Sequence, residues 1–275
     1  MARKTLDRAL AFGGLALAVI LLIAGGLLTW GNSFAHGQVK KQLSREQIMM
    51  PSGAAIASLP DADQAALKPF AKDGNNLMDT GAEAEAYADH YIAVHMRVAG
   101  EGLIARATAL GVTEIPGKNG APATPMPEVA NYANASNVVG ALTAAAADLP
   151  APAAVTCAVD ATDATKINCT PKSDPTAAPT TITCTKDAQG ADKATCLTTL
   201  ANDITTARTA TFFTGDSLRG MLLNAYAWDT VGTVAGVAAL VCWILGGVLA
   251  LVAAFGFVRI ARDPARRVTE SAESK

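Results

Sequence analysis

The stretch ALAFGGLALAVILLIAGGLLTW, residues 9–30, decides the fold, because it runs for 22 residues without a charged side chain. A helix rises about 1.5 Å per residue, so about 20 apolar residues cross the ~30 Å hydrocarbon layer of a bilayer. A second uncharged stretch, VGTVAGVAALVCWILGGVLALVAAFGFV at 231–258, is longer and can span with some tilt. The sequence therefore predicts two transmembrane helices.

A cleaved signal peptide is the alternative for the first stretch. Basic residues precede it, and Ser33-Phe34-Ala35 offers a small-x-small cleavage site. The apolar core of a signal peptide is about 7–15 residues long, however. Because the run at 9–30 is longer, we expect it to be retained as a membrane span.

The distribution of basic residues predicts the orientation. They gather at one end of each span: Arg3, Lys4 and Arg8 before the first, and Arg259, Arg262, Arg266 and Arg267 after the second. Since cytoplasmic flanks carry the excess of Lys and Arg, both termini are expected in the cytoplasm and residues 31–229 outside it. Trp30, Tyr226 and Trp228 then fall together at the outer interface, where amphipathic rings prefer to lie.

Composition and charge narrow the partners. The chain is 51% apolar and 17% charged, and the apolar excess lies in the two predicted spans. Residues 31–229 hold 14 Lys and Arg against 20 Asp and Glu, whereas the two ends hold 8 against 4. An acidic outer segment argues against nucleic acid, whose phosphates need basic partners. The lipid bilayer is the expected partner, and its anionic inner leaflet suits the basic tails.

Four cysteines form an internal repeat, VTCAVDATDATKINCT at 155–170 and ITCTKDAQGADKATCL at 182–197. Each copy has cysteines twelve positions apart around a polar, turn-rich middle, which predicts two β-hairpins with Cys157 bridged to Cys169 and Cys184 to Cys196. Four cysteines allow three connectivities, so crossed pairings stay open. Metal binding is the alternative, but a C-x2-C knuckle is missing. Cys242 is expected to pack within the second span.

The expected fold class is a mainly α membrane protein with a helical extracytoplasmic domain and a small disulfide-closed β-hairpin insertion. Soluble helices are predicted at 61–70, at 82–99 continuing weakly to 110, and at 129–149. The expected segments are a cytoplasmic tail at 1–8, the first span at 9–30, a stalk and helical domain at 31–110, a Pro/Gly/Ala-rich connection and helix at 111–154, the disulfide-closed insertion at 155–199, a helix leading to the membrane at 200–229, the second span at 230–258, and a cytoplasmic tail at 259–275.

The residues that carry chemistry elsewhere do not cluster here. His90 and His95 are five positions apart, about 140° around a helix, so one helix cannot offer both to one ion. A metal or catalytic role for His90 with Asp89 or Glu83 is the less favoured alternative to packing or surface exposure. We therefore predict no catalytic, cofactor or metal residues, and no enzymatic activity.

Small residues in the second span predict helix packing through Gly232, Gly236, Gly246 and Gly247. Gly232 and Gly246 are close to four full turns apart, so they share one side of a helix. The partner could be the first span, which has its own glycine pairs, or a neighbouring subunit. A homo-oligomer or a larger membrane complex is accordingly expected.

Three stretches carry a resemblance: GNSFAHGQVKKQLSREQIMMP at 31–51, AEAYADHYIAVHM at 84–96 and LRGMLLNAYAWDTVGTVAG at 218–236. The chain resembles a family of uncharacterised actinobacterial two-span membrane proteins with an extracytoplasmic domain, over about half of its length. The cysteine repeat departs from that family's pattern. The expected function is a non-enzymatic structural or accessory membrane protein. The alternative is an extracytoplasmic ligand-binding or sensing module, and the short tails weaken sensing but not binding.

Overall fold

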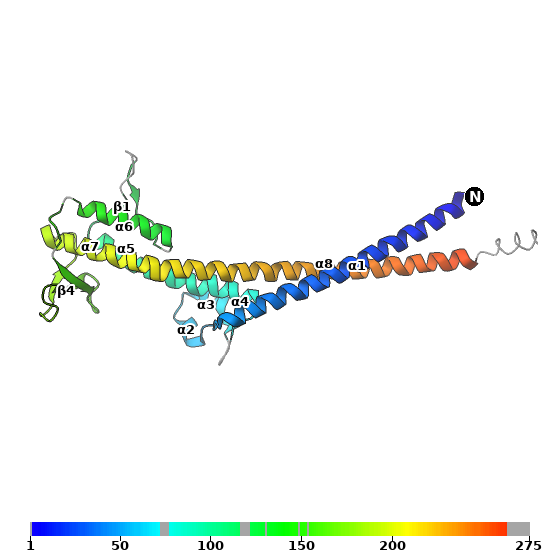
Figure 1. Cartoon of the computed structure of the whole chain (residues 1–275), viewed down its shortest axis with the longest axis horizontal. Coiled ribbons are helices and arrows are strands. Elements are labelled where there is room, and N and C mark those ends of the chain that lie inside the picture. Colours follow the sequence, from blue (N-terminus) through cyan, green and yellow to red (C-terminus); the bar gives the residue numbers. More distant parts are fainter. Residues whose placement is uncertain are drawn as a thin grey trace, which may run out of the picture. The chain divides into compact units, whose positions relative to one another are not determined.

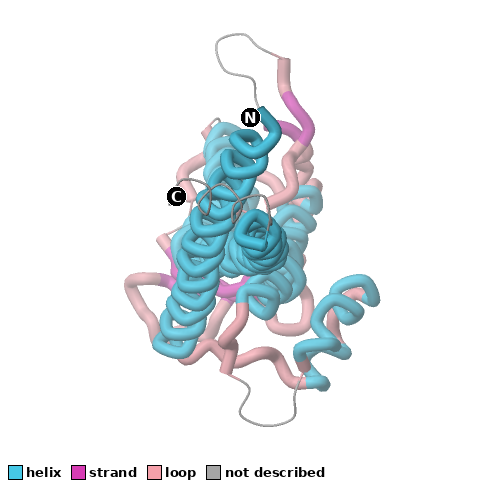
Figure 2. The backbone as a smooth tube through the Cα atoms, turned by 90° about the vertical axis from the view of Figure 1, so that its right-hand side faces the viewer, coloured by secondary structure: helices cyan, strands magenta, loops and turns pink. Residues whose placement is uncertain are grey.

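The computed structural model is mainly helical, with small antiparallel sheets and disulfides (Figures 1 and 2). It describes residues 2–71, 77–115, 122–129, 131–147, 149–152 and 154–262, with side chains from 8 to 259. The chain forms two compact units. We call residues 1–49, 77–84 and 224–275 the helix-pair unit, and residues 50–76 and 85–223 the disulfide unit.

Two long helices form the helix-pair unit. Helix α1 runs from Ala2 to Glu46, and helix α8 from Thr214 to Arg262, of which the part from Asn224 onward belongs to this unit (Figure 1). Both are long and apolar enough to cross a membrane. The predicted span at 9–30 is therefore part of a longer helix that continues through the expected stalk.

The disulfide unit is built from shorter elements. Its helices are α2 (Gly53–Ala57), α3 (Asp61–Leu67), the 3-10 turn η1 (Lys68–Phe70), the end of α4 (Gly81–Tyr87), the π-helical turn η2 (Ala88–Ile92), α5 (Ala93–Ala109), α6 (Tyr132–Ala146), α7 (Gly190–Ala207), the π-helical turn η4 (Arg208–Phe213) and the start of α8. Strands β1 (Glu114–Ile115) and β2 (Thr124–Pro125) pair antiparallel. This pairing lies inside the segment at 111–154 that was expected to be a Pro/Gly/Ala-rich connection and a helix.

Helices α6 and α7 pack against each other in the core of this unit. Each buries an apolar stripe at helical spacing, and Val138 and Leu142 of α6 with Leu200 and Ile204 of α7 are at most 1% exposed. Burying one such side chain contributes about 1.5–3 kcal/mol. Helix α5 enters the core beside the residues before α6, because Gly100 leaves room for the carbonyl oxygen of Val129. A side chain at position 100 would collide with that oxygen.

The predicted soluble helices are present with altered bounds. The helix expected at 61–70 is α3 followed by η1, and the helix expected at 129–149 is α6. The helix expected at 82–110 is interrupted by the π-helical turn η2. There Arg219 of α8 donates from Nε to the carbonyl oxygen of Ala88 at 3.1 Å and from Nη2 to Asp89 at 2.8 Å. A partner so distant in sequence has no signature in the local pattern.

The first cysteine repeat is the predicted hairpin. Strand β3 (Val155–Val159) pairs antiparallel with β4 (Lys166–Pro171), and Cys157 lies directly opposite Cys169, to which it is bridged. The turn between them is held by Asp160, whose Oδ1 accepts hydrogen bonds from the backbone N–H groups of Thr162 and Asp163. Both strand residues and turn therefore match the prediction.

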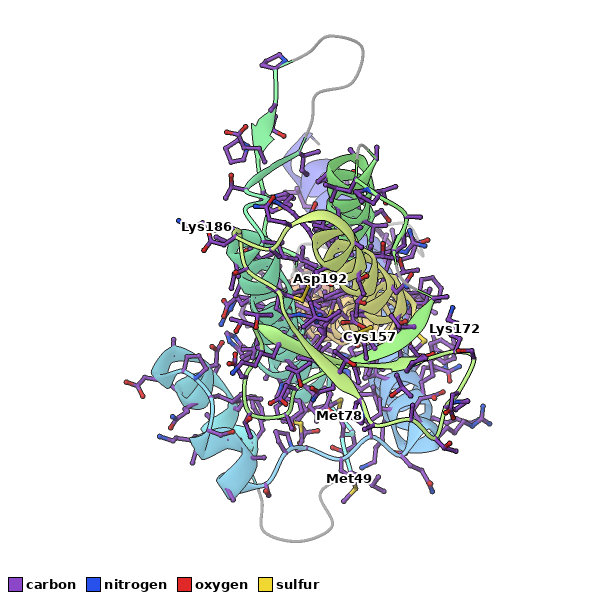
Figure 3. The ribbon with its side chains drawn as sticks, turned by 90° about the vertical axis from the view of Figure 1, so that its left-hand side faces the viewer. Met49, Met78, Cys157, Lys172, Lys186 and Asp192 are labelled. Atoms are coloured by element: carbon purple, nitrogen blue, oxygen red, sulfur yellow. A yellow bond between two sulfur atoms is a disulfide. The ribbon has the colours of Figure 1, made fainter. Side chains whose placement is uncertain are left out.

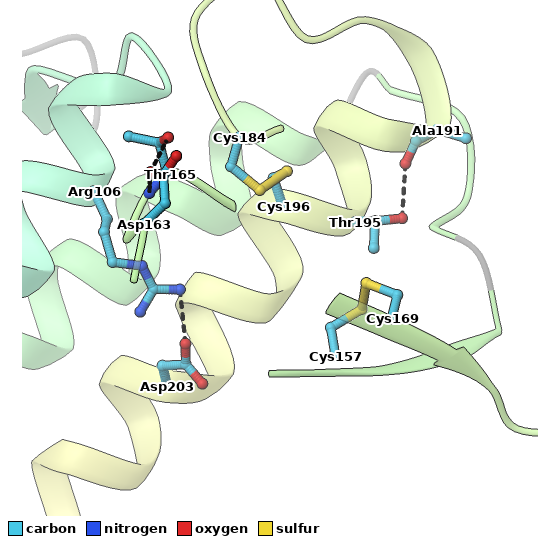
Figure 4. The surroundings of a disulfide bond; sticks show 10 residues. All are labelled: Arg106, Cys157, Asp163, Thr165, Cys169, Cys184, Ala191, Thr195, Cys196 and Asp203. Carbon is cyan, nitrogen blue, oxygen red and sulfur yellow. Dashed lines mark hydrogen bonds and ion pairs between the residues drawn. A yellow bond between two sulfur atoms is a disulfide. The ribbon is translucent and has the colours of Figure 1, made fainter. Parts of the chain in front are cut away.

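The second repeat forms the predicted Cys184–Cys196 bridge but not the predicted hairpin (Figure 4). Strand β5 (Thr180–Thr183) precedes Cys184 and pairs with β4 of the first repeat. Cys196 lies in helix α7 instead of a strand. Helix α7 therefore runs across the boundary expected at 199, and its buried residues Ala194, Leu197 and Leu200 recur at helical spacing from within the repeat.

Candidate functional site: the seam of the helix pair

Helices α1 and α8 pack antiparallel through small residues, and we call their contact the seam. A Cβ atom placed on Gly232 would meet the His36 ring at 2.8 Å, one on Gly236 would meet Asn32 at 3.1 Å, and one on Gly246 would meet Leu22 at 3.1 Å. Each step forward along α8 thus meets an earlier residue of α1. The glycines allow the two backbones to approach closely, which is how helices associate where lipid supplies no hydrophobic drive.

Three of the four glycines predicted to pack lie against α1. Gly232, Gly236 and Gly246 face α1, which was one of the two partners expected. Gly247 has nothing within 4 Å of its Cβ position among the described residues. The physical reason is that consecutive helical residues are about 100° apart, so Gly247 points away where Gly246 points in.

A hydrogen-bond chain crosses the middle of the seam. The indole Nε1 of Trp243 donates to the hydroxyl oxygen of Thr29 at 3.1 Å, and that hydroxyl donates to the carbonyl oxygen of Gly25 at 2.7 Å. Gly25 also makes room, because a Cβ atom there would lie 3.3 Å from Trp243 Nε1. The Trp243 indole and the Thr29 hydroxyl therefore both have hydrogen-bond partners within an apolar stretch. An unpaired N–H group in hydrocarbon would cost about several kcal/mol.

Polar side chains occupy one end of the seam. His36 Nδ1 lies 2.9 Å from the carbonyl oxygen of Asn32, which makes this nitrogen the donor. Its Nε2 lies 3.5 Å from both Asp229 Oδ1 and Thr233 Oγ1 of α8. No local pattern predicts this pair, because 193 positions separate His36 from Asp229.

The segment Leu77–Ala84 packs on the same end of the helix pair. Met78 N–H donates to the carbonyl oxygen of Ile48 at 2.9 Å, and Lys40 Nζ lies 2.8 Å from Asp79 Oδ2. A Cβ atom on Gly81 would collide with Asp229, so this segment and α8 are in close contact.

Glu83 fixes the start of helix α4 in this segment. Its buried carboxylate accepts hydrogen bonds from the N–H groups of Asp79 at 2.8 Å and Thr80 at 3.1 Å, while the Thr80 hydroxyl accepts from the N–H of Glu83. This reciprocal arrangement is a capping box. Glu83 is therefore occupied with backbone groups.

The helix pair presents apolar side chains outward. Only 17% of the residues in the most apolar window of each helix are buried. Exposed members of this outer surface include Leu10, Ile20, Leu27, Val234, Leu240, Leu251 and Phe255. Phe12 and Phe257 pack edge to face with their ring centroids 5.0 Å apart, so α1 and α8 also meet near the start of α1.

The aromatic residues expected at one interface lie at different levels of the pair. Trp30 is close to Asn32, which contacts Gly236, whereas Trp228 lies a turn before Gly232, which contacts His36. Trp30 and Trp228 are therefore about ten positions, or ~15 Å, apart along the helices. Both are more than half exposed, and Tyr226 is half-buried. The prediction placed them together because it treated the spans as ending at equal heights.

The histidines of the disulfide unit have structural partners. His90 Nδ1 lies 2.9 Å from Asp63 Oδ1, and not beside Asp89 or Glu83 as the less favoured hypothesis required. His95 Nδ1 lies 2.8 Å from the carbonyl oxygen of Tyr91. Among the described residues there is no group of three or more His, Cys, Asp or Glu side chains that could hold a metal ion.

Part of the basic flank can be located. Arg8 and Arg259 are exposed. Arg266 and Arg267 lie outside the described residues, as do the side chains of Arg3, Lys4 and Arg262.

Comparison with protein-family models, curated proteins and solved structures finds no match to this chain.

Proposed function

We propose that this protein is a structural or accessory component of a cell membrane, anchored by α1 and α8 as a pair of transmembrane helices and without catalytic activity. The outward apolar surface of the pair is the observation that carries this proposal. A core helix of a soluble protein buries its apolar side chains. In each of these helices, only 17% of the most apolar 18-residue stretch is buried. Lipid tails are a suitable cover for such a surface.

The seam supports crossing as a pair. Its polar groups, such as the Trp243 indole and the Thr29 hydroxyl, have hydrogen-bond partners within the pair. Because the helices are antiparallel, a pair that crosses the bilayer has both ends of the chain on the same side. The excess of Lys and Arg between each apolar stretch and the nearer end of the chain favours a cytoplasmic location for both ends. Residues of the disulfide unit would then lie outside the cytoplasm, where disulfides persist.

Thiol labelling on intact cells tests this topology. The background is Cys242→Ala, and a membrane-impermeant maleimide is applied to Ser173→Cys, an exposed position of the disulfide unit, or to Ser271→Cys. We expect labelling at 173 without permeabilisation and labelling at 271 only after it. Labelling of 271 on intact cells would overturn the orientation, and extraction of the protein by alkaline carbonate would overturn membrane insertion.

The proposal includes self-association or membership of a larger envelope complex. The glycines that face α1 are already in contact, so a neighbour would use the outward surface, which includes Gly13, Gly26 and Gly247; among the described residues none has an atom within 4 Å of its Cβ position. Light scattering of the protein in mild detergent, with analysis of co-purified proteins, tests this. A monomer without a co-purified partner would contradict it.

A further inference from the structure

One face of α1 carries a continuous stripe of exposed side chains, on the side opposite the seam. Its apolar members recur at helical spacing, and Trp30 stacks on Phe34 with ring centroids 5.4 Å apart. The exposed fractions are 47% for Val19, 60% for Ile23, 65% for Leu27, 67% for Trp30 and 50% for Phe34. This stripe is the surface that would meet lipid.

Cations bracket the apolar stripe at both ends. Arg8 precedes it, while Lys41 and Arg45 continue the same face beyond Phe34. Lys41 follows Arg8 by 33 positions, a rise of about 50 Å along the helix. A bilayer with its headgroups is about 40–45 Å thick, and transmembrane helices tilt by about 20° on average. The two cationic levels therefore match the two headgroup layers.

Lys41 and Arg45 are exposed and free to contact lipid. Neither forms an ion pair with any described residue, in contrast to Lys40, which is held by Asp79. Helical side chains tilt toward the N-terminus, so both extend back toward the apolar stripe. The neighbouring carboxylate of Glu46 lies about 100° around the helix.

We propose that Lys41 and Arg45 of α1 bind the phosphates of anionic phospholipid headgroups in the leaflet that holds Trp30 and Phe34. This inference rests on the proposed membrane crossing. It assigns a lipid contact to the acidic side of the chain, where residues 31–229 carry a net negative charge. Juxtamembrane cations attract an anionic surface by about 1 kcal/mol each, which corresponds to about a fivefold preference per cation.

The experiment uses the full-length protein in nanodiscs containing equal amounts of phosphatidylglycerol and phosphatidylcholine. Lipids that stay bound after transfer to detergent are counted by native mass spectrometry. We expect enrichment of phosphatidylglycerol in the wild type, and about a fivefold loss of that enrichment for each of Lys41→Gln and Arg45→Gln. High salt should reduce the enrichment, because it shortens the screening length. Lys41→Arg should preserve it.

The matched control is Lys172→Gln with Lys186→Gln, two exposed cations of the disulfide unit that are labelled in Figure 3. It is compared with the combined variant Lys41→Gln/Arg45→Gln. Equal losses in the control and in this combined variant, or unchanged enrichment in the latter, would overturn the inference. Carbonate extraction of the same proteins separates the two proposals. Protein that stays in the membrane without any lipid preference refutes only the headgroup site, whereas extracted protein refutes the membrane crossing.

Discussion

The two cysteine repeats have the same spacing and fold differently. In the first, Cys157 and Cys169 face each other across paired strands. In the second, Cys184 follows a strand and Cys196 lies in a helix, yet the bridge closes a loop of the same length. Equal cysteine spacing thus specifies which residues are linked, but not the secondary structure that links them.

One aligned position accounts for much of the difference. Where the first repeat has Asp163 in its turn, the second has Gly190, whose φ of 52° lies in the left-handed region that favours glycine. The chain then enters α7. After the second cysteine, Pro171 ends strand β4, whereas Leu197 continues a run of helix-spaced apolar residues. The residues around each cysteine therefore decide whether it lies in a strand or in a helix.

Removing the bridges should give the largest effects. Each closes a loop with a separation of 12 residues, so Cys157→Ala/Cys169→Ala and Cys184→Ala/Cys196→Ala should each cost about 3 kcal/mol. We expect a greater loss for the second pair, because Cys184 and Cys196 are both buried and the bridge joins a strand end to the core helix α7. Urea unfolding of the full-length protein in mild detergent measures both.

Hydrogen exchange distinguishes the consequences of the two losses. The β3–β4 ladder should stay protected without its bridge, since its backbone hydrogen bonds remain. Residues 180–197 should lose protection without theirs. Equal free-energy losses with equal exchange would show that the two bridges play the same structural role.

The residues that follow the second cysteine of each repeat test the difference between the repeats in a second way. Leu197 is fully buried in α7, and Leu197→Ala should lower the free energy of unfolding by about 2–5 kcal/mol. Thr170, the aligned residue of the first repeat, is half-buried in β4, and Thr170→Ala should cost less than about 1 kcal/mol. The same urea titration compares them. A similar cost at both positions would mean that the second repeat behaves as a strand.

Local patterns predicted the parts of the fold whose signal is local. Long uncharged runs predicted α1 and the second half of α8, and helix-spaced apolar residues predicted α3, α5 and α6. The pairing of β4 with β5 could not be predicted, because it joins two repeats through eight intervening residues, 172–179, that carry no hairpin signal. The π-helical turn at η2 was also missed, since its partner Arg219 is distant in sequence.

The candidate site was predictable only in outline. Glycines indicated a packing face, but the sequence left open whether α1 or another subunit covers it. The polar end was not predicted, because His36 and Asp229 come together only when the antiparallel register is known. Register also separates Trp30 from Trp228, which charge and composition had placed at one level.

Gly246 and Gly247 of α8 are adjacent but differ in their surroundings, as the two cysteine repeats do. Gly246→Leu should open the helix pair at a cost of about 1–3 kcal/mol, because its Cβ would lie 3.1 Å from Leu22. Gly247→Leu should be tolerated, since its Cβ position has no neighbour within 4 Å among the described residues. The readout is oxidative cross-linking of Ala11→Cys with Gly256→Cys in a Cys242→Ala background. The contact of 3.7 Å at this pair suits a disulfide. Equal loss of cross-linking in both leucine variants would contradict the seam.

Acid titration of the turn between β3 and β4, in the first cysteine repeat, should give the smallest effect on stability. Hydrogen bonds from Lys166 and then Thr165 lower the pKa of Asp163 from 3.8 to about 2. Because the folded pKa is depressed, the stabilisation is complete above the ordinary pKa and is lost as the pH falls toward 2. The second repeat has Gly190 at this position and cannot lose such a contact. The amide resonance of Thr165, whose N–H donates to Asp163 at 3.0 Å, should titrate with a midpoint near 2 and lose this step in Asp163→Asn. A midpoint near 4 would show that the turn is not closed by the carboxylate, and that the first repeat owes its hairpin to the strands and the bridge alone.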